Sequence, residues 1–211
     1  MKPAAMQEPM PYPNQPHRRL HGPTGYDDWT AFKPRLRDEF EFRCVFCRLR
    51  EAWFPHGADS FSVEHLKPRS IAPELALIYD NMLYACSHCN SNKRDNWPIM
   101  DPCKVSYGRH FYVRDDGTIE ALTKEGRRMV RLLQLDDEEM NRIRLRFLRL
   151  IRLLWANQTN TEAWDLYREI MGYPSKLPDL GTLRPSDNIR PDGISQSHIQ
   201  RSRRGELPEV Y

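Results

Sequence analysis

The sequence predicts an α+β protein, and three observations support this fold class. Two Cys-x-x-Cys pairs enclose a segment that contains two short runs typical of strands. An Asp116-Gly117 turn between two aromatic or β-branched runs favours a β-hairpin. Residues 123–171 have apolar side chains at the three- and four-residue spacing of helices. We therefore expect a small metal-stapled core, a hairpin and a helical C-terminal part.

The composition is that of a water-soluble chain, with 29% charged residues against 39% hydrophobic ones. A formal net charge of +3 permits nucleic-acid binding without requiring it. The sequence contains neither an apolar run of about 18 residues, as a membrane span needs, nor the pattern of a signal peptide. We expect no membrane association and a cytoplasmic location, where thiols stay reduced.

Residues 1–25 contain six of the seventeen prolines and have no hydrophobic period, so a flexible or loosely docked arm is expected. A helix is predicted over 26–40, where Trp29, Phe32, Leu36 and Phe40 share one face. The core would extend over 26–122, including the hairpin.

Two strands and a helix are predicted between and beside the cysteine pairs. The run 61–66 alternates and ends at Lys67-Pro68, where the proline removes a ladder donor. A second strand is expected over 82–85 and a short polar helix over 87–94.

The paired cysteines predict a structural Zn²⁺ site. Each pair can present two thiolates to one tetrahedral ion; the four ligands would be Cys44, Cys47, Cys86 and Cys89. Buried or disulfide-bonded cysteines are the alternative. Cys103 has no partner at such a spacing and is expected to be a small buried residue. His88 could be a zinc ligand, a phosphate contact or a surface residue, and we favour the surface role.

The residues enclosed by these pairs resemble the HNH endonuclease family, the ββα-metal nucleases. The resemblance rests on Glu64-His65-Leu66-Lys67-Pro68, Asn81 and Cys89-Asn90-Ser91-Asn92-Lys93. It departs from the commoner pattern in having Glu64 in place of Asp. It implies that a strand, a second strand and a helix bring Glu64, His65 and Asn90 together.

The resemblance also implies roles. His65 would deprotonate a water, and Glu64 and Asn90 would offer oxygen ligands to Mg²⁺ or Mn²⁺. Asn81 would hold the loop after His65. Lys93 would meet a phosphate, and we add two neighbouring cations as candidate nucleic-acid contacts, Lys67 and Arg94.

The helical part is expected over 123–172, as helices 123–135, 136–157 and 161–171. On the second helix an arginine stripe, Arg142, Arg146 and Arg149, is either a solvated face or a surface for a nucleic-acid backbone or an acidic partner. Residues 173–211 lack periodicity and predict a disordered basic tail.

The sequence thus predicts a metal-dependent HNH endonuclease that cuts DNA. The order of motif, hairpin and arginine-rich helix also resembles the order in HNH subunits of Septu-type anti-phage systems. This resemblance implies that the protein is a defence effector that works with a protein partner such as an ATPase. The alternative is a zinc-dependent nucleic-acid-binding module whose nuclease site is inactive.

Overall fold

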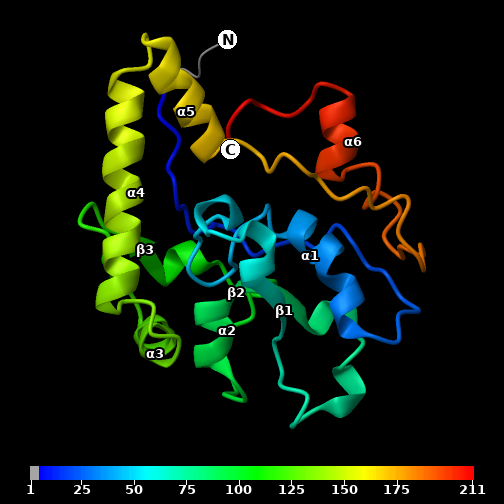
Figure 1. The fold of residues 1–211 in the computed structure, drawn as a ribbon. Helices are drawn as coiled ribbons and strands as arrows, with labels where there is room; N and C mark the ends of the chain where they lie inside the picture. Colours follow the sequence, from blue (N-terminus) through cyan, green and yellow to red (C-terminus); the bar gives the residue numbers. More distant parts are fainter. Residues whose placement is uncertain (1–4) are drawn as a thin grey trace.

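The protein is described by a computed structural model over residues 5–211, so residues 1–4 of the expected arm lie outside the described residues. Two two-stranded sheets and a set of helices surround one main hydrophobic core (Figure 1). The strands are β1 Phe61–His65, β2 Met82–Cys86, β3 Phe111–Val113 and β4 Ile119–Ala121. The α-helices are α1 Lys33–Glu39, α2 Ser87–Lys93, α3 Lys124–Leu132, α4 Glu138–Ala156, α5 Thr161–Met171 and α6 His198–Arg203.

The first sheet and α2 form the ββα unit that the sequence predicts. β1 and β2 pair antiparallel, with Phe61 opposite Cys86 and His65 opposite Met82. All five residues of β2 are buried, because one face of the strand meets the core and the other meets the cysteine cluster and the helix. Since α2 begins directly after Cys86, it starts beside the first residue of β1 and runs along that strand.

The predicted helix over 26–40 is divided into two parts. A 3₁₀ turn at Trp29–Phe32 is capped by Asp28, whose carboxylate accepts a hydrogen bond from the Thr30 amide. α1 then begins at Lys33, with Pro34 in its first turn, where a missing amide hydrogen does not matter. The expected apolar face is present, because Phe32, Leu36 and Phe40 are all buried.

The hairpin and the three following helices are also found where the sequence predicts them. The strands β3 and β4 pair antiparallel. α4 begins two residues later than expected, because the Asp137 carboxylate caps it by accepting from the Met140 amide. α5 packs against α4, and Ile151, Leu154, Tyr167, Met171 and Val210 form a second, smaller apolar cluster there.

One arginine of α4, outside the stripe that the sequence analysis describes, is buried. Arg144 is fully buried and donates hydrogen bonds to the carbonyl oxygens of Gly117 and Leu135, each at 2.6 Å. These contacts fasten the hairpin turn to α4. Gly117 has a φ of +84°, and a Cβ there would lie 2.5 Å from the Asn141 carbonyl oxygen, so glycine is required for this close approach.

The described part of the N-terminal segment, residues 5–25, is docked rather than flexible. Met10 and Tyr12 are buried, and the Tyr12 hydroxyl donates to the Phe46 carbonyl at 2.8 Å. The His21 imidazole meets the Asp38 carboxylate at 2.9 Å. Figure 1 shows the first part of this segment, in dark blue, passing beside α4, and the later part curving around α1. The expectation of a loose arm is wrong here, because isolated apolar and polar side chains, without any period, are held by long-range partners.

The C-terminal segment differs from its prediction for the same reason. Residues 173–211 contain α6, and their buried residues include Leu180, His198 and Val210. The His198 amide donates to Asp38 Oδ1 at 2.8 Å, and Pro23 forms an isolated antiparallel bridge with Asn188. The two ends of the described chain therefore pack on one another and on α1. Within residues 5–211, no helix combines the length and the apolar character that crossing a bilayer requires.

Candidate active site

The end of β1 and the first turns of α2 meet in an open cleft of about 640 Å³. Glu64, His65 and Asn90 all line it. The cause is the strand register, which places the start of α2 beside Phe61, so that Asn90 reaches Ser62 and Lys93 reaches Glu64. The sequence prediction that these three side chains converge is therefore met by the geometry. The remaining lining residues are Trp29, Ser62, Val63, Pro68, Arg69, Ser70, Arg94 and Asp95.

His65 is held in an orientation that leaves one ring nitrogen open. Its Nε2 lies 2.9 Å from the Ala76 carbonyl oxygen. A carbonyl oxygen can only accept a hydrogen bond, so Nε2 carries the proton and the Nδ1 lone pair is unprotonated. Burial lowers the pKa of His65, and the positive charges of Arg69 and Lys93 lower it further, against the opposing effect of the Ala76 bond. A neutral imidazole at neutral pH can act as a general base.

Asn81 fixes the loop that follows His65. Its side-chain oxygen accepts from the Lys67 amide at 2.9 Å, and its nitrogen donates to the Lys67 carbonyl at 3.0 Å. A further, longer bond reaches the Leu75 carbonyl at 3.4 Å. Lys67 and Leu75 lie at the two ends of the loop that leads to Ala76. Because Asn81 binds both, it holds in place the Ala76 carbonyl that orients His65. It does not line the cleft itself.

Glu64 is paired with Lys93, so the structure places Lys93 in the interior, whereas the sequence analysis expects it to contact a phosphate. The Lys93 ammonium is fully buried, and it lies 3.0 Å from Glu64 Oε1. A buried ammonium costs too much free energy to leave unpaired, so the nearest carboxylate takes it. Burial raises the pKa of Glu64, although the charge and hydrogen bond of Lys93 act to lower it.

The donor set of the cleft fits a hard divalent cation. Glu64 supplies a carboxylate. The Asn90 amide nitrogen donates to Ser62 Oγ at 2.7 Å, which turns the amide so that its oxygen remains available. Oxygen donors of this kind are those that Mg²⁺ and Mn²⁺ prefer, with water completing the coordination.

The other two candidate nucleic-acid contacts have different surroundings. Arg94 is exposed and lines the cleft, with its Nε bonded to the Ser91 carbonyl at 3.1 Å. Lys67 instead lines a neighbouring cavity with Asn81 and Trp97. Their roles toward nucleic acid stay predictions.

Among the cleft residues that the sequence analysis did not assign to the site are Trp29 and Arg69. Trp29 was assigned only to the buried face of a helix, and Arg69 only to a loop. The Arg69 guanidinium lies 3.8 Å from the centre of the Trp29 ring, whose edge faces the His65 ring at 6.2 Å. The signal available in the sequence was a cation placed four residues after His65, at the start of the loop that must border the site.

The four paired cysteines form a cluster that could hold a metal ion. The Sγ atoms of Cys44, Cys47, Cys86 and Cys89 all lie within 4.8 Å of one another, and all four residues are buried. Tetrahedral zinc with Zn–S bonds of about 2.3 Å needs sulfur atoms roughly 3.8 Å apart. The Cys47 and Cys86 sulfur atoms lie 3.7 Å apart, so the cluster fits such an ion.

Neither His88, which was weighed as a zinc ligand, nor Cys103, which was expected to be a small buried residue, belongs to this cluster. His88 lies 3.1 Å from the Gln134 carbonyl oxygen and 3.3 Å from Asp137, in agreement with a role outside the metal site. Cys103 is half-buried in the cavity that Lys67 lines.

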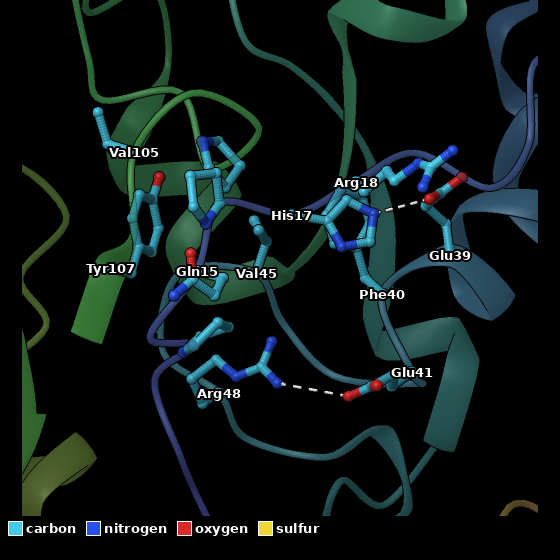
Figure 2. Close-up of a pocket in the computed structure, with 13 residues that line it drawn as sticks. Gln15, His17, Arg18, Glu39, Phe40, Glu41, Val45, Arg48, Val105 and Tyr107 are labelled. Atoms are coloured by element: carbon cyan, nitrogen blue, oxygen red, sulfur yellow. Dashed lines mark hydrogen bonds and ion pairs between the residues drawn. The ribbon is translucent and has the colours of Figure 1, made fainter. Parts of the chain in front are cut away.

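A separate cavity of about 250 Å³ lies between the N-terminal segment and the first cysteine pair (Figure 2). Within it His17 meets Glu39 at 2.7 Å and Arg48 meets Glu41 at 3.8 Å. None of the nuclease candidates lines it. The His17–Glu39 pair joins the N-terminal segment to α1, so this cavity belongs to the docking of that segment on the core.

Comparison with known proteins agrees with the geometry. Residues 44–96 match the family model described as "HNH endonuclease", so this part of the chain is an HNH endonuclease domain. The matched range contains both cysteine pairs and every residue of the predicted site. The chain is also similar to the "Retron Vc95 putative HNH endonuclease" of Vibrio cholerae serotype O1 biovar El Tor. The two are 28% identical over 106 residues, which covers 44% of this chain and 49% of the relative. The chain therefore matches about half the length of that relative.

Proposed function

We propose that this protein is a metal-dependent endonuclease that hydrolyses phosphodiester bonds of DNA through its HNH domain. The observation that carries the proposal is the convergence of Glu64, His65 and Asn90 in one open cleft. The cysteine cluster beside β2 would hold a structural Zn²⁺ and fix the start of α2. Such a staple would keep Asn90 in place relative to β1.

The side chains divide the chemistry among them. His65 would take a proton from the attacking water at Nδ1, because Nε2 is committed to the Ala76 carbonyl. Asn81 would keep that carbonyl in place through the loop. Glu64 and Asn90 would hold Mg²⁺ or Mn²⁺, which when bound stabilises negative charge on the phosphate and the departing oxygen. Arg94, exposed at the edge of the cleft, would contact the strand.

The Glu64–Lys93 pair favours a second candidate function. A carboxylate that is already neutralised by a buried ammonium at 3.0 Å is a weaker ligand for a divalent cation. If no divalent ion binds there, the chain would be a zinc-dependent nucleic-acid-binding module with an inactive site. We prefer the nuclease, because Asn90 and His65 line the same cleft and the Nδ1 of His65 is not committed to the Ala76 carbonyl.

A plasmid-nicking assay with Mg²⁺ or Mn²⁺ separates these functions. The wild-type protein should convert supercoiled plasmid to nicked or linear forms, and His65→Ala should abolish this. His56→Ala is a matched control, since His56 is exposed in a loop and lines none of these cavities. If the wild-type protein binds DNA but does not cut it, even with candidate partners present, the binding-module function would replace the nuclease function.

We also propose that the protein acts in the cytoplasm as an anti-phage effector, together with a partner such as an ATPase. The support for this role is the resemblance of the motif order to Septu-type subunits and the relative whose name ties it to a retron. Affinity purification from the native host, followed by identification of co-eluting protein and nucleic acid, tests this part. Recovery of the chain alone, from infected and uninfected cells, would contradict it.

A further inference from the structure

Arg69 is a cation at the cleft that has no acidic partner. It is exposed and lines the same cleft as His65. Among residues 5–211, no carboxylate oxygen lies within 4.0 Å of its guanidinium. Arg94, the other arginine that lines the cleft, is held by a bond from its Nε to the Ser91 carbonyl at 3.1 Å. The five donors of the Arg69 guanidinium are therefore open to an anion in the cleft.

Trp29 holds this guanidinium in position. The ring lies 3.8 Å below the cation, which is a close cation–π distance. Trp29 itself is anchored in the capped turn Trp29–Phe32 and packs against the main core. Stacking restricts the side chain of Arg69 before any ligand binds, so less conformational entropy is lost on binding.

The charges of the cleft also favour an anion near Arg69. Glu64 is neutralised by Lys93, and Asp95 is matched by Arg94 in number. The cleft therefore keeps one positive charge in excess, and its two exposed cations are Arg69 and Arg94. A planar guanidinium suits the two non-bridging oxygens of a phosphodiester, to which it can donate two parallel hydrogen bonds.

We propose that Arg69, stacked on Trp29, binds a phosphate of the nucleic-acid strand that enters the Glu64–His65–Asn90 cleft, and that Trp29 is its positioning residue. The proposal rests on the proposed function, since it places the substrate of that function in the same cleft. Arg69 would contact the substrate from the loop side of the cleft. Asn90 would act from the opposite side, on α2. The strand would then lie between the loop that begins at Arg69 and the end of α2.

The experiment measures binding and cutting separately. Affinity for a short fluorescein-labelled DNA duplex is measured over a salt series in the His65→Ala background, so that no cutting interferes. Arg69→Gln should reduce the slope of log affinity against log salt by about 1, as loss of one phosphate contact requires. Arg69→Lys should keep the slope, because it keeps the charge. Arg127→Gln, a change of an exposed arginine on α3, is the matched control and should leave the slope unchanged.

In the otherwise wild-type protein the same substitutions are tested for cutting. Arg69→Gln should lower kcat/KM about 10- to 100-fold, the range for one charged hydrogen-bonded contact. Arg69→Lys should recover only part of this, because an ammonium cannot donate in a fixed fork. Trp29→Leu should keep the salt slope and weaken binding about two- to fivefold, as expected for loss of a cation–π contact that orders the arginine.

The outcomes separate this inference from the proposed function. An unchanged salt slope and unchanged cutting in Arg69→Gln, with a wild type that cuts, would overturn the inference alone. A lowered melting temperature of Arg69→Gln with an unchanged slope would assign the arginine to packing of the loop and also overturn it. A wild type that neither binds nor cuts DNA would refute the proposed function instead.

Discussion

Replacing Lys93 by methionine tests whether its ammonium belongs to the interior or to the substrate. The side chain is 0% exposed, and its only carboxylate partner within the described residues is Glu64, itself 7% exposed, at 3.0 Å. Lys93→Met keeps the side chain's length and removes the charge, so the Glu64 carboxylate is left buried without its counter-charge. Breaking a buried pair in this way costs about 3–5 kcal/mol.

For a chain of this size, each kcal/mol lowers the melting temperature by about 2–4 °C, so the expected decrease is about 6–20 °C. The measurement is thermal unfolding by circular dichroism or calorimetry, without added Mg²⁺ or Mn²⁺. The double variant Glu64→Gln/Lys93→Met should recover most of the loss, because neither partner is then an unpaired charge.

Lys104→Met is the matched control for this experiment. Lys104 is 81% exposed and lies 3.6 Å from Asp101, and an exposed pair of that kind contributes about 0–1 kcal/mol. An unchanged melting temperature in Lys93→Met, together with a weaker dependence of DNA binding on salt, would refute the reasoning. That combination would return Lys93 to the role of a phosphate contact.

Three further predictions concern the metal cluster, the loop and the N-terminal docking site. Cys44→Ser should lose bound zinc, measured by atomic absorption, and fold poorly, whereas Cys103→Ser should keep both zinc and melting temperature; equal zinc content in the two variants would contradict the cluster assignment. Asn81→Ala should lower stability by about 1–3 kcal/mol and reduce kcat more than it raises KM, since it removes the bonds that fix the loop beside His65; a change confined to KM would argue against a positioning role. Burial alone would raise the pKa of Asp38, but its bonds to His198 and His21 lower it to about 2. Because the pKa of Asp38 is lower in the folded than in the unfolded protein, its ionised carboxylate stabilises the fold above pH 4 by about 2.5 kcal/mol. This stabilisation is lost as the pH falls toward 2. Asp38→Asn should remove that part of the acid dependence of unfolding by denaturant, and an unchanged pH dependence would contradict it.

The sequence by itself determined the parts of this protein that local chemistry specifies. The paired cysteines, the run ending at His65 and the polar helix after Cys86 are signals within a few residues, and the ββα unit follows from them. Asn81 is a similar case, because its predicted task of holding the loop after His65 agrees with its three hydrogen bonds. The hairpin and α3–α5 likewise follow from a turn and from regular apolar spacing.

Only the tertiary structure decided which charged side chains are interior and which are open to a ligand. The sequence predicts a phosphate contact for Lys93 and no role for Arg144, but both are buried, Lys93 beside Glu64 and Arg144 against the Gly117 carbonyl. Arg69 has no such partner and faces the cleft instead. The docking of residues 5–25 and 173–211 has the same origin. A polar group can be buried when the fold brings a hydrogen-bonding or oppositely charged partner to it. Such a partner comes from a distant part of the chain, so the local sequence pattern does not predict it.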